Sequence, residues 1–253
     1  MIKHIEIENK SGKILRGYLD LPENFNGELV VFYHGYTGHK SEHANHFRNF
    51  SRILSKNGYG SLRMDFSGNG ESDGEFYEFT MDTLMDDAKL MYEFAKKYKG
   101  VKKVDLLGFS MGGGVATMMS AIYGNEINKL ILWSAAGEIP EHIRRSFDNG
   151  IKLDNGNVII AGNFELSKEM YDSTYKYDPF LGIEKYTNPV ILVHGRNDLA
   201  VNYLTSMRYS VRYPNALVHI IDGAGHGYDK LEEGKELYQK SLEFLLNDYT
   251  IKK

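Results

Sequence analysis

The residues best placed to do chemistry in this sequence are those of the segment Gly-Phe-Ser-Met-Gly at 108–112. An apolar run at 104–107 precedes it, and small residues at 113–117 indicate the start of a helix. A serine on a tight strand-to-helix turn takes a strained backbone conformation, and glycine two residues before and after it removes the clashes that side chains would make. The turn exposes the hydroxyl and directs the first N–H groups of the helix to the place where an oxyanion would form. The pattern predicts a nucleophilic Ser110.

A hydrolytic serine also needs a base and an acid, and both types of side chain follow later apolar runs. Asp198 comes after the run 189–193, and His226 comes after the run 217–221. Both runs look like buried strands of a parallel sheet, and open α/β sheets place their sites just past the carboxyl ends of such strands. We therefore expect His226 to take the proton of Ser110 and Asp198 to hold the imidazole in the correct tautomer.

Other residues compete for these roles. Ser110 could be an ordinary helix N-cap, the proposed acid could merely cap the helix that follows it, and Asp222 is a rival acid. Among the histidines, His219 lies inside a strand pattern and is expected in the core or at its side. His34 and His194 each precede a glycine at a strand end, and we expect them to orient loops. His226 is favoured as the base because it lies in a glycine-rich loop just before the last expected helix.

A metal site or a cofactor is not expected. His39, His43 and His46, with Glu42, have a metal-like spacing, but they open a helix and contain no H-E-x-x-H pattern, so a solvated face is the preferred interpretation. The glycine-rich segment 65–70 lacks the lysine of a phosphate-binding loop and is expected to be structural. The chain has no cysteine, which excludes disulfides, cysteine ligands and a cysteine nucleophile.

The elements that must position these residues alternate along the chain. An antiparallel hairpin is expected to open the fold around Ser11-Gly12, and Thr80 is expected to cap a helix. We expect strands at 29–34, 60–66, 103–108, 129–134, 189–194 and 216–221, and helices near 43–57, 80–98 and 230–248. Such alternation requires right-handed crossovers and predicts an α/β fold with a mostly parallel, doubly wound sheet.

One connection is too long for a simple link between a strand and a helix. It runs from Trp133 to Val190 and contains apolar stretches at 151–153 and 158–161, which flank Asp-Asn-Gly-Asn at 154–157. Asn-Gly tolerates positive φ, so these stretches predict a hairpin. We interpret 137–186 as an inserted cap subdomain within a single domain, 1–253.

Composition limits the class of protein. The 253 residues are 42% hydrophobic and 25% charged, enough to bury one core, and the net charge of −4 disfavours nucleic-acid and anionic-membrane partners. The first residues form no continuous apolar signal segment, and no run approaches the roughly 18 apolar residues of a membrane span. We expect a cytoplasmic protein that needs only a small-molecule ester as partner, with a homodimer as an open possibility.

The order of Ser110, Asp198 and His226, with His34-Gly35 after an expected strand, resembles the α/β-hydrolase superfamily over nearly the whole chain. This resemblance implies the α/β-hydrolase fold, with an antiparallel N-terminal hairpin beside the parallel sheet and a cap that covers the acyl pocket. The H-G-x-x-D pattern of the superfamily favours the acid at position 198 over its rival.

Three segments, 34–40, 65–72 and 108–112, are most similar to the bacterial cinnamoyl (feruloyl) esterases. Related esterases, monoacylglycerol lipases and acyl-peptidase relatives have similar sequences in these segments. The resemblance implies that the backbone N–H groups of Tyr36 and Met111 form the oxyanion hole.

The function implied is that of a cofactor-independent serine carboxylesterase that hydrolyses small or aromatic, hydroxycinnamoyl-type esters through an acyl-enzyme. In the cap, Glu138 or a tyrosine hydroxyl, with Tyr171 and Tyr175 as candidates, is expected to bind the phenol end of the acyl group. The alternative use of the cap's aromatic rings is its own small core. Monoacylglycerol lipase-like or thioesterase activity on medium-chain acyl groups is the alternative enzyme function, and a non-catalytic ligand-binding protein is the alternative class.

Overall fold

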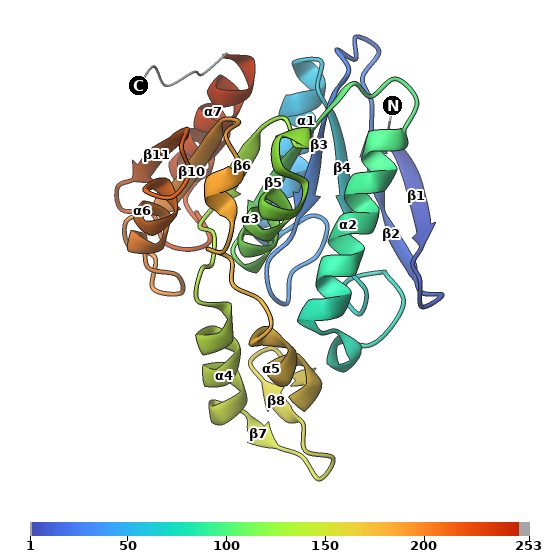
Figure 1. The fold of residues 1–253 in the computed structure, drawn as a ribbon, viewed down its shortest axis with the longest axis vertical. Coiled ribbons are helices and arrows are strands. Elements are labelled where there is room, and N and C mark those ends of the chain that lie inside the picture. Colours follow the sequence, from blue (N-terminus) through green and yellow to red (C-terminus); the bar gives the residue numbers. More distant parts are fainter. Residues whose placement is uncertain (1, 248–253) are drawn as a thin grey trace.

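The protein is built on an eight-stranded sheet with the order β1-β2-β4-β3-β5-β6-β10-β11. The structure, a computed structural model, describes residues 2–247. The strands are β1 (Ile2–Glu8), β2 (Ile14–Asp20), β3 (Glu28–Tyr33), β4 (Gly60–Met64), β5 (Lys103–Phe109), β6 (Leu130–Trp133), β10 (Val190–Gly195) and β11 (Ala216–Ile221). The pairs from β4 to β11 are parallel, while β1 and β2 pair antiparallel with each other and β2 pairs antiparallel with β4 (Figure 1). The predicted mostly parallel sheet with an antiparallel N-terminal hairpin is confirmed.

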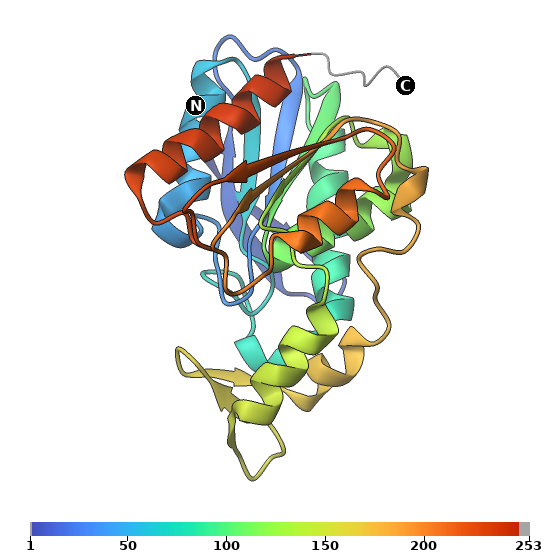
Figure 2. The same cartoon turned by 90° about the vertical axis from the view of Figure 1, so that its left-hand side faces the viewer.

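Helices cover both faces of this sheet (Figures 1 and 2). On one face lie α1 (His46–Lys56) and α7 (Leu231–Leu246), and on the other lie α2 (Met81–Lys97), α3 (Met111–Tyr123) and α6 (Leu204–Ser210). Along β3, Val30 and Phe32 pack towards α1 and α7, whereas Leu29 and Val31 pack towards α2 and α3. Because both faces are buried, the central strands are apolar at nearly every position.

Local signals place most helix ends where the sequence predicted them. The Oγ1 atom of Thr80 accepts a hydrogen bond from the N–H of Thr83 at 3.2 Å and caps α2. The helix expected from position 43 begins later, because Ala44 and Asn45 have φ angles of 50° and 59°, which break the α-helical conformation. A single 3₁₀ turn, His43–Asn45, therefore precedes α1.

The long connection after β6 folds as α4 (Ile139–Asn149), a small antiparallel sheet and α5 (Lys168–Thr174), followed by a 3₁₀ turn at Ile183–Lys185. Its sheet consists of β7 (Ile151–Lys152), β8 (Val158–Ile160) and β9 (Phe164–Leu166). Ile151 pairs with Ile159, as the predicted hairpin requires. The third strand, β9, was not predicted, because a three-residue Phe-Glu-Leu segment is too short to show a period. This insertion forms the lower end of the molecule in Figure 1, below the eight-stranded sheet.

No helix within residues 2–247 has both the length and the apolar character that crossing a bilayer requires.

Candidate active site

Ser110 lies on the turn between β5 and α3 with φ 53° and ψ −120°, a strained conformation for a residue with a side chain. A Cβ atom on Gly108 would lie 2.2 Å from the carbonyl oxygen of Gly112, and one on Gly112 would lie 2.0 Å from that of Tyr33. The expectation that glycine is required at both positions is confirmed. The close approach of three backbone segments holds the serine in its strained conformation.

The structure brings the three residues of the expected triad together from distant parts of the chain. The Nε2 atom of His226 lies 3.0 Å from the Oγ atom of Ser110, and its Nδ1 atom lies 2.7 Å from the Oδ2 atom of Asp198. Because a carboxylate only accepts, Nδ1 carries the proton, and Nε2 is left to accept the serine O–H. The rival acid Asp222 is exposed and forms an ion pair with Arg196 instead.

The carboxylate of Asp198 is saturated with hydrogen-bond donors. Its Oδ1 atom accepts from the N–H groups of Ala200 and Val201 at 2.9 and 2.8 Å, and its Oδ2 atom accepts from His226 and, at 3.1 Å, from the Nε2 atom of His194. Burial alone raises the pKa of Asp198, but the hydrogen bonds from His194 and His226 outweigh it and hold the pKa below its ordinary value. Asp198 therefore stays ionised and can stabilise an imidazolium.

His194 has a closer link to the site than loop orientation, which is all that the sequence suggested. It is fully buried, and its Nε2 atom also lies 2.9 Å from the carbonyl oxygen of Val201, so this nitrogen carries the proton. Its Nδ1 atom then accepts from the hydroxyl of Ser206 at 2.7 Å. Each ring nitrogen thus has a partner in one neutral tautomer, and the ring donates to the same Oδ2 atom of Asp198 that accepts from His226.

His34 and His219 serve other purposes. The Nε2 atom of His34 accepts from the N–H of Phe66 at 3.1 Å, and its Nδ1 atom lies 2.9 Å from the carbonyl oxygen of Gly35, so the ring ties the loops after β3 and β4 together. Burial lowers the pKa of His34, in keeping with a neutral ring. His219, on β11, pairs with Glu236 at 2.7 Å.

The backbone N–H groups of Tyr36 and Met111 are free to bind an oxyanion. Neither hydrogen-bonds to any acceptor within the described residues, although Tyr36, Met111 and Ser110 border the same cavity. The loop is held by the buried Glu42, whose Oε2 atom accepts from the N–H of Gly35 at 2.7 Å. The sequence analysis placed Glu42 on a solvated face, which is wrong because the side chain is only 6% exposed. No local pattern distinguishes a buried carboxylate at this position from a solvated one.

Two cavities meet at Ser110, and Tyr36 and His226 border both of them. The first, here called the α4 cavity, has a volume of about 330 Å³ and lies beneath α4. Its remaining lining residues are Met111, Ala136, Ile139, His142, Ile143, Arg145, Ser146, Leu199, Ala200 and Val201. The second, here called the loop cavity, has a volume of about 500 Å³. Its remaining lining residues are Gly35, Thr37, Gly38, His39, Glu42, His43, Phe109, Gly227 and Asp229.

The cap residues expected to bind substrate, Glu138, Tyr171 and Tyr175, are not among the described residues that line these two cavities. Glu138 precedes α4 and turns towards α6, where it pairs with Arg208 and accepts from the Oγ1 atom of Thr205 at 3.1 Å. The hydroxyls of Tyr171 and Tyr175 lie 3.2 Å apart on the outside of the insertion, where Tyr175 is 61% exposed. The side of α4 that borders the cavity carries four residues at helical spacing, namely Ile139, His142, Ile143 and Ser146.

The histidines after β3 do not form a metal site. His43 pairs with Asp229 at 2.5 Å, and His46 contacts the hydroxyl of Tyr238 and the carbonyl oxygen of Gly227 at 2.5 and 2.8 Å. Within residues 2–247 no group of three or more metal-binding side chains is close enough to hold an ion.

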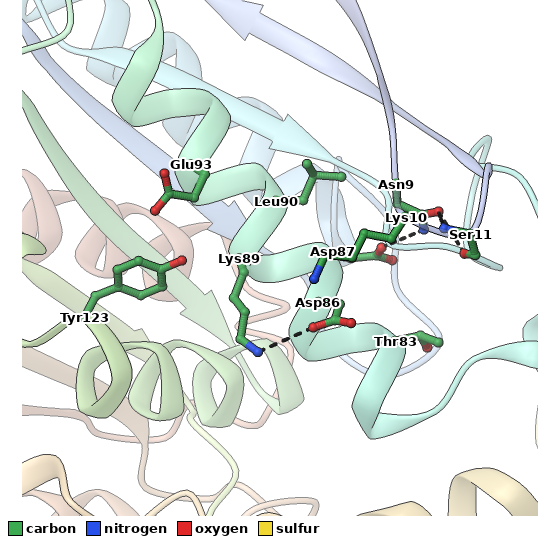
Figure 3. A pocket seen from close by; sticks show the side chains of 10 residues that line it. All are labelled: Asn9, Lys10, Ser11, Thr83, Asp86, Asp87, Lys89, Leu90, Glu93 and Tyr123. Carbon is green, nitrogen blue, oxygen red and sulfur yellow. Dashed lines mark hydrogen bonds and ion pairs between the residues drawn. The ribbon is translucent and has the colours of Figure 1, made fainter.

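Figure 3 shows a pocket away from Ser110, between the first hairpin turn and α2. Its volume is about 500 Å³. The carboxylate of Asp87 accepts from the side chain of Asn9 at 3.0 Å, and Asp86 pairs with Lys89 (Figure 3). Asp87 also accepts from the N–H of Ser67 at 2.9 Å. The side chains of Asn9, Asp86 and Asp87 that line this pocket are therefore bonded within the protein and stabilise the fold.

A parallel sheet that presents a strained serine beside a histidine and an ionised aspartate defines a hydrolase of the α/β-hydrolase type. The chain belongs to the Hydrolase_4 family, described as serine aminopeptidase, S33, whose match spans residues 26–153.

Known proteins of similar sequence and structure are hydrolases. The structure of Est1E from Butyrivibrio proteoclasticus with bound ferulic acid has a TM-score of 0.84 and 29% identity, and the match covers 96% of this chain and 100% of that chain. The 2-hydroxy-6-oxo-6-(2'-aminophenyl)hexa-2,4-dienoic acid hydrolase of Metapseudomonas resinovorans is 25% identical over 87% of this chain and 84% of its own. Esterase Pf2001 of Pyrococcus furiosus, with a TM-score of 0.73, 23% identity and coverage of 97% and 90%, shares the fold.

Proposed function

We propose that this protein is a serine carboxylesterase that hydrolyses small or aromatic esters of the hydroxycinnamoyl type through an acyl-enzyme. The observation that supports this most directly is the hydrogen-bonded series from Ser110 through His226 to Asp198, with the two oxyanion amides beside it. The three side chains are within hydrogen-bonding distance of one another in the absence of substrate.

In this mechanism the Oγ atom of Ser110 attacks the ester carbonyl while the Nε2 atom of His226 takes its proton. The carbonyl oxygen becomes an oxyanion between the N–H groups of Tyr36 and Met111, and the loss of one such donor costs about 3 kcal/mol of transition-state stabilisation. Collapse of this intermediate breaks the bond to the alkoxide, which leaves with the proton from His226. Water, activated by the same imidazole, then releases the acid and restores the serine.

The α4 cavity has a size and a surface that suit an aromatic acyl group. Its volume of about 330 Å³ suits a small ligand, and Ile139, Ile143 and Met111 give it an apolar surface. The ferulic acid bound to Est1E is aromatic, and the substrate named for the Metapseudomonas hydrolase carries an aminophenyl ring. Medium-chain aliphatic acyl groups remain the alternative for the same cavity.

Labelling with a fluorophosphonate probe tests the nucleophile. The wild-type enzyme is expected to be labelled and Ser110→Ala is not, whereas the control Ser210→Ala, which alters a hydroxyl on α6 that lines neither cavity, is labelled like the wild type. Absence of label on the wild type, or undiminished label on Ser110→Ala, would contradict the proposed function.

A substrate series tests the acyl preference. Hydrolysis of methyl ferulate is compared with that of methyl esters of acetate, octanoate and dodecanoate under the same conditions. A flat aromatic slot ranks ferulate first and an aliphatic tunnel ranks the longer chains first, so a higher kcat/KM for octanoate would favour the lipase-like alternative.

A further inference from the structure

The side of α4 that faces the α4 cavity carries polar groups without partners. His142, Arg145 and Ser146 line the cavity, and within residues 2–247 none of their side chains makes a hydrogen bond or an ion pair. The buried hydroxyl of Tyr36 also has no hydrogen-bond partner within these residues, whereas Asp198 and Glu42 are bonded within the protein. The unpaired groups of α4 are therefore available to a ligand without breaking any internal bond.

The two cavities that meet at Ser110 differ in the sign of their charge. Arg145 is the one described side chain lining the α4 cavity that is always charged, and no acidic residue lines that cavity. The loop cavity is lined by the carboxylates of Glu42 and Asp229. An acyl group with a negatively charged end is attracted into the α4 cavity and repelled from the loop cavity, which determines the orientation of the ester across Ser110.

His142 can bind an anion in the α4 cavity without adding a second positive charge. It is half-buried, and burial first, then the charge of Arg145, lowers its pKa. The carboxylates of Glu138 and Glu141 oppose this shift less strongly, so the pKa stays below its ordinary value. A neutral imidazole can donate one hydrogen bond to a carboxylate oxygen while the planar guanidinium supplies the charge.

We infer that the α4 cavity selects acyl groups whose far end is a carboxylate, and that Arg145 recognises it with His142 and Ser146 beside it. This inference rests on the proposed function, because it assumes that the acyl group occupies the α4 cavity during hydrolysis at Ser110. Among the aromatic esters of the proposed function, it favours half-esters of dicarboxylic acids over esters whose acyl group ends in a neutral phenol.

The test compares two activated esters of the same shape, the 4-nitrophenyl esters of 4-carboxycinnamic acid and of 4-carbamoylcinnamic acid. The wild type is expected to have at least a tenfold higher kcat/KM for the carboxylate. In Arg145→Gln this ratio falls by about tenfold, and in Arg145→Glu it inverts, because charge-assisted hydrogen bonds are lost and then replaced by repulsion.

The neighbouring Arg144 provides a matched control. It lies on the same exposed helix and lines neither cavity, so Arg144→Gln should leave the ratio unchanged. Thermal unfolding verifies that each variant is folded.

An Arg145→Gln variant with an unchanged ratio, or a wild type that does not favour the carboxylate, would overturn the inference, and so would a labelled enzyme that hydrolyses neither ester. In each of these cases fluorophosphonate labelling of Ser110 would still support the serine hydrolase. Loss of that labelling is the separate outcome that contradicts the proposed function itself.

Discussion

The groups around Ser110 that come from the sheet differ sharply from those that come from α4. On the sheet side, Asp198 and His226 have every ring nitrogen and carboxylate oxygen bonded in place. On the α4 side, the side chains of His142 and Arg145 make no hydrogen bond or ion pair in the described part of the chain. Preorganised donors lower the barrier for any ester, whereas unpaired groups gain partners only from a ligand that matches them. We therefore expect the residues from the sheet to carry out the reaction and those of the inserted helix to select the substrate.

Burial explains this difference. The strands that end at the site are covered on both faces, so an unbonded polar group there would be costly. In α4 only Ile139 and Ile143 are buried, and the other side chains of the helix remain in contact with solvent or with the cavity. Changes on the sheet side should lower turnover of every substrate, and changes on α4 should alter the ratio between substrates.

The largest expected effect follows from Asp198→Asn. An amide presents a different donor pattern to His226, which favours the wrong tautomer, and kcat should fall by about 10⁴-fold for aromatic and aliphatic esters alike. Steady-state kinetics with both esters measure this. The control Asp222→Asn removes the exposed rival and should change kcat by less than about twofold; a larger loss in the control would reassign the acid.

A smaller effect is expected for His194→Asn. The variant removes the Nε2–H donor from the buried oxygen of Asp198, and a hydrogen bond to a charged group contributes about 1.5–3 kcal/mol, so kcat should fall at least tenfold for every ester. His219→Asn, which alters a histidine bonded to Glu236 away from the site, should leave kcat unchanged. A change in substrate preference without a change in kcat would place His194 on the selective side of the comparison.

A few-fold effect is expected for Ile143→Ala. This side chain is 2% exposed and lines the α4 cavity, so its truncation should cost about 2–4 kcal/mol of stability and enlarge the cavity. The ratio of kcat/KM for octanoate to that for ferulate should rise, which an acyl-chain series measures, and urea unfolding reports the stability. If all esters lose activity equally, α4 contributes to the reaction as well as to selection.

The smallest expected effect on turnover concerns Asp105, a buried residue on the sheet whose carboxylate is poorly paired. Its Oδ1 atom accepts from Asn128 at 2.7 Å, and its Oδ2 atom has no hydrogen-bond partner among residues 2–247. Burial raises the pKa of Asp105 to about 7. The folded protein thus holds a proton between about pH 4 and 7 that the unfolded chain has released, so stability falls as pH rises through this range. At about 1.4 kcal/mol per pKa unit, the total fall is about 4 kcal/mol.

Asp105→Asn cannot ionise and should remove this fall, while kcat stays within about twofold of the wild type. Urea unfolding at pH 5 and pH 8 measures the difference for both proteins. An unchanged pH dependence in the variant would show that the free energy of unfolding is controlled by other groups.

Much of the fold could be predicted because its signals are local. Apolar runs that alternate with helical patterns along the chain predicted the parallel strands. The glycines at 108 and 112 predicted the turn that exposes Ser110. The order of polar residues after strand ends predicted which side chains the structure brings together, because the carboxyl ends of parallel strands share one edge. Helical spacing from Ile139 to Ile143 was also visible and would have placed His142 and Ser146 beside the cavity.

Other features depend on contacts between residues that lie far apart in the sequence, and no local pattern predicts these contacts. Glu138 turned away from the cavity because Arg208 and Thr205 lie on a helix that only the folded chain brings beside it. His194 reached Asp198 because the loop after β10 folds back on its own strand. Such pairings are chosen by the free energy of burial and hydrogen bonding in the whole molecule.

The sequence by itself determined the order of the strands along the chain, the strained serine turn and the chemical types available at the sheet edge, since these depend on residues a few positions apart. Only the tertiary structure decided which polar groups are satisfied internally and which stay unpaired beside Ser110. The reason is that a side chain's hydrogen-bond partners and charge environment are set by segments far away in sequence, and these same partners decide whether the group stabilises the fold or remains free to bind a substrate.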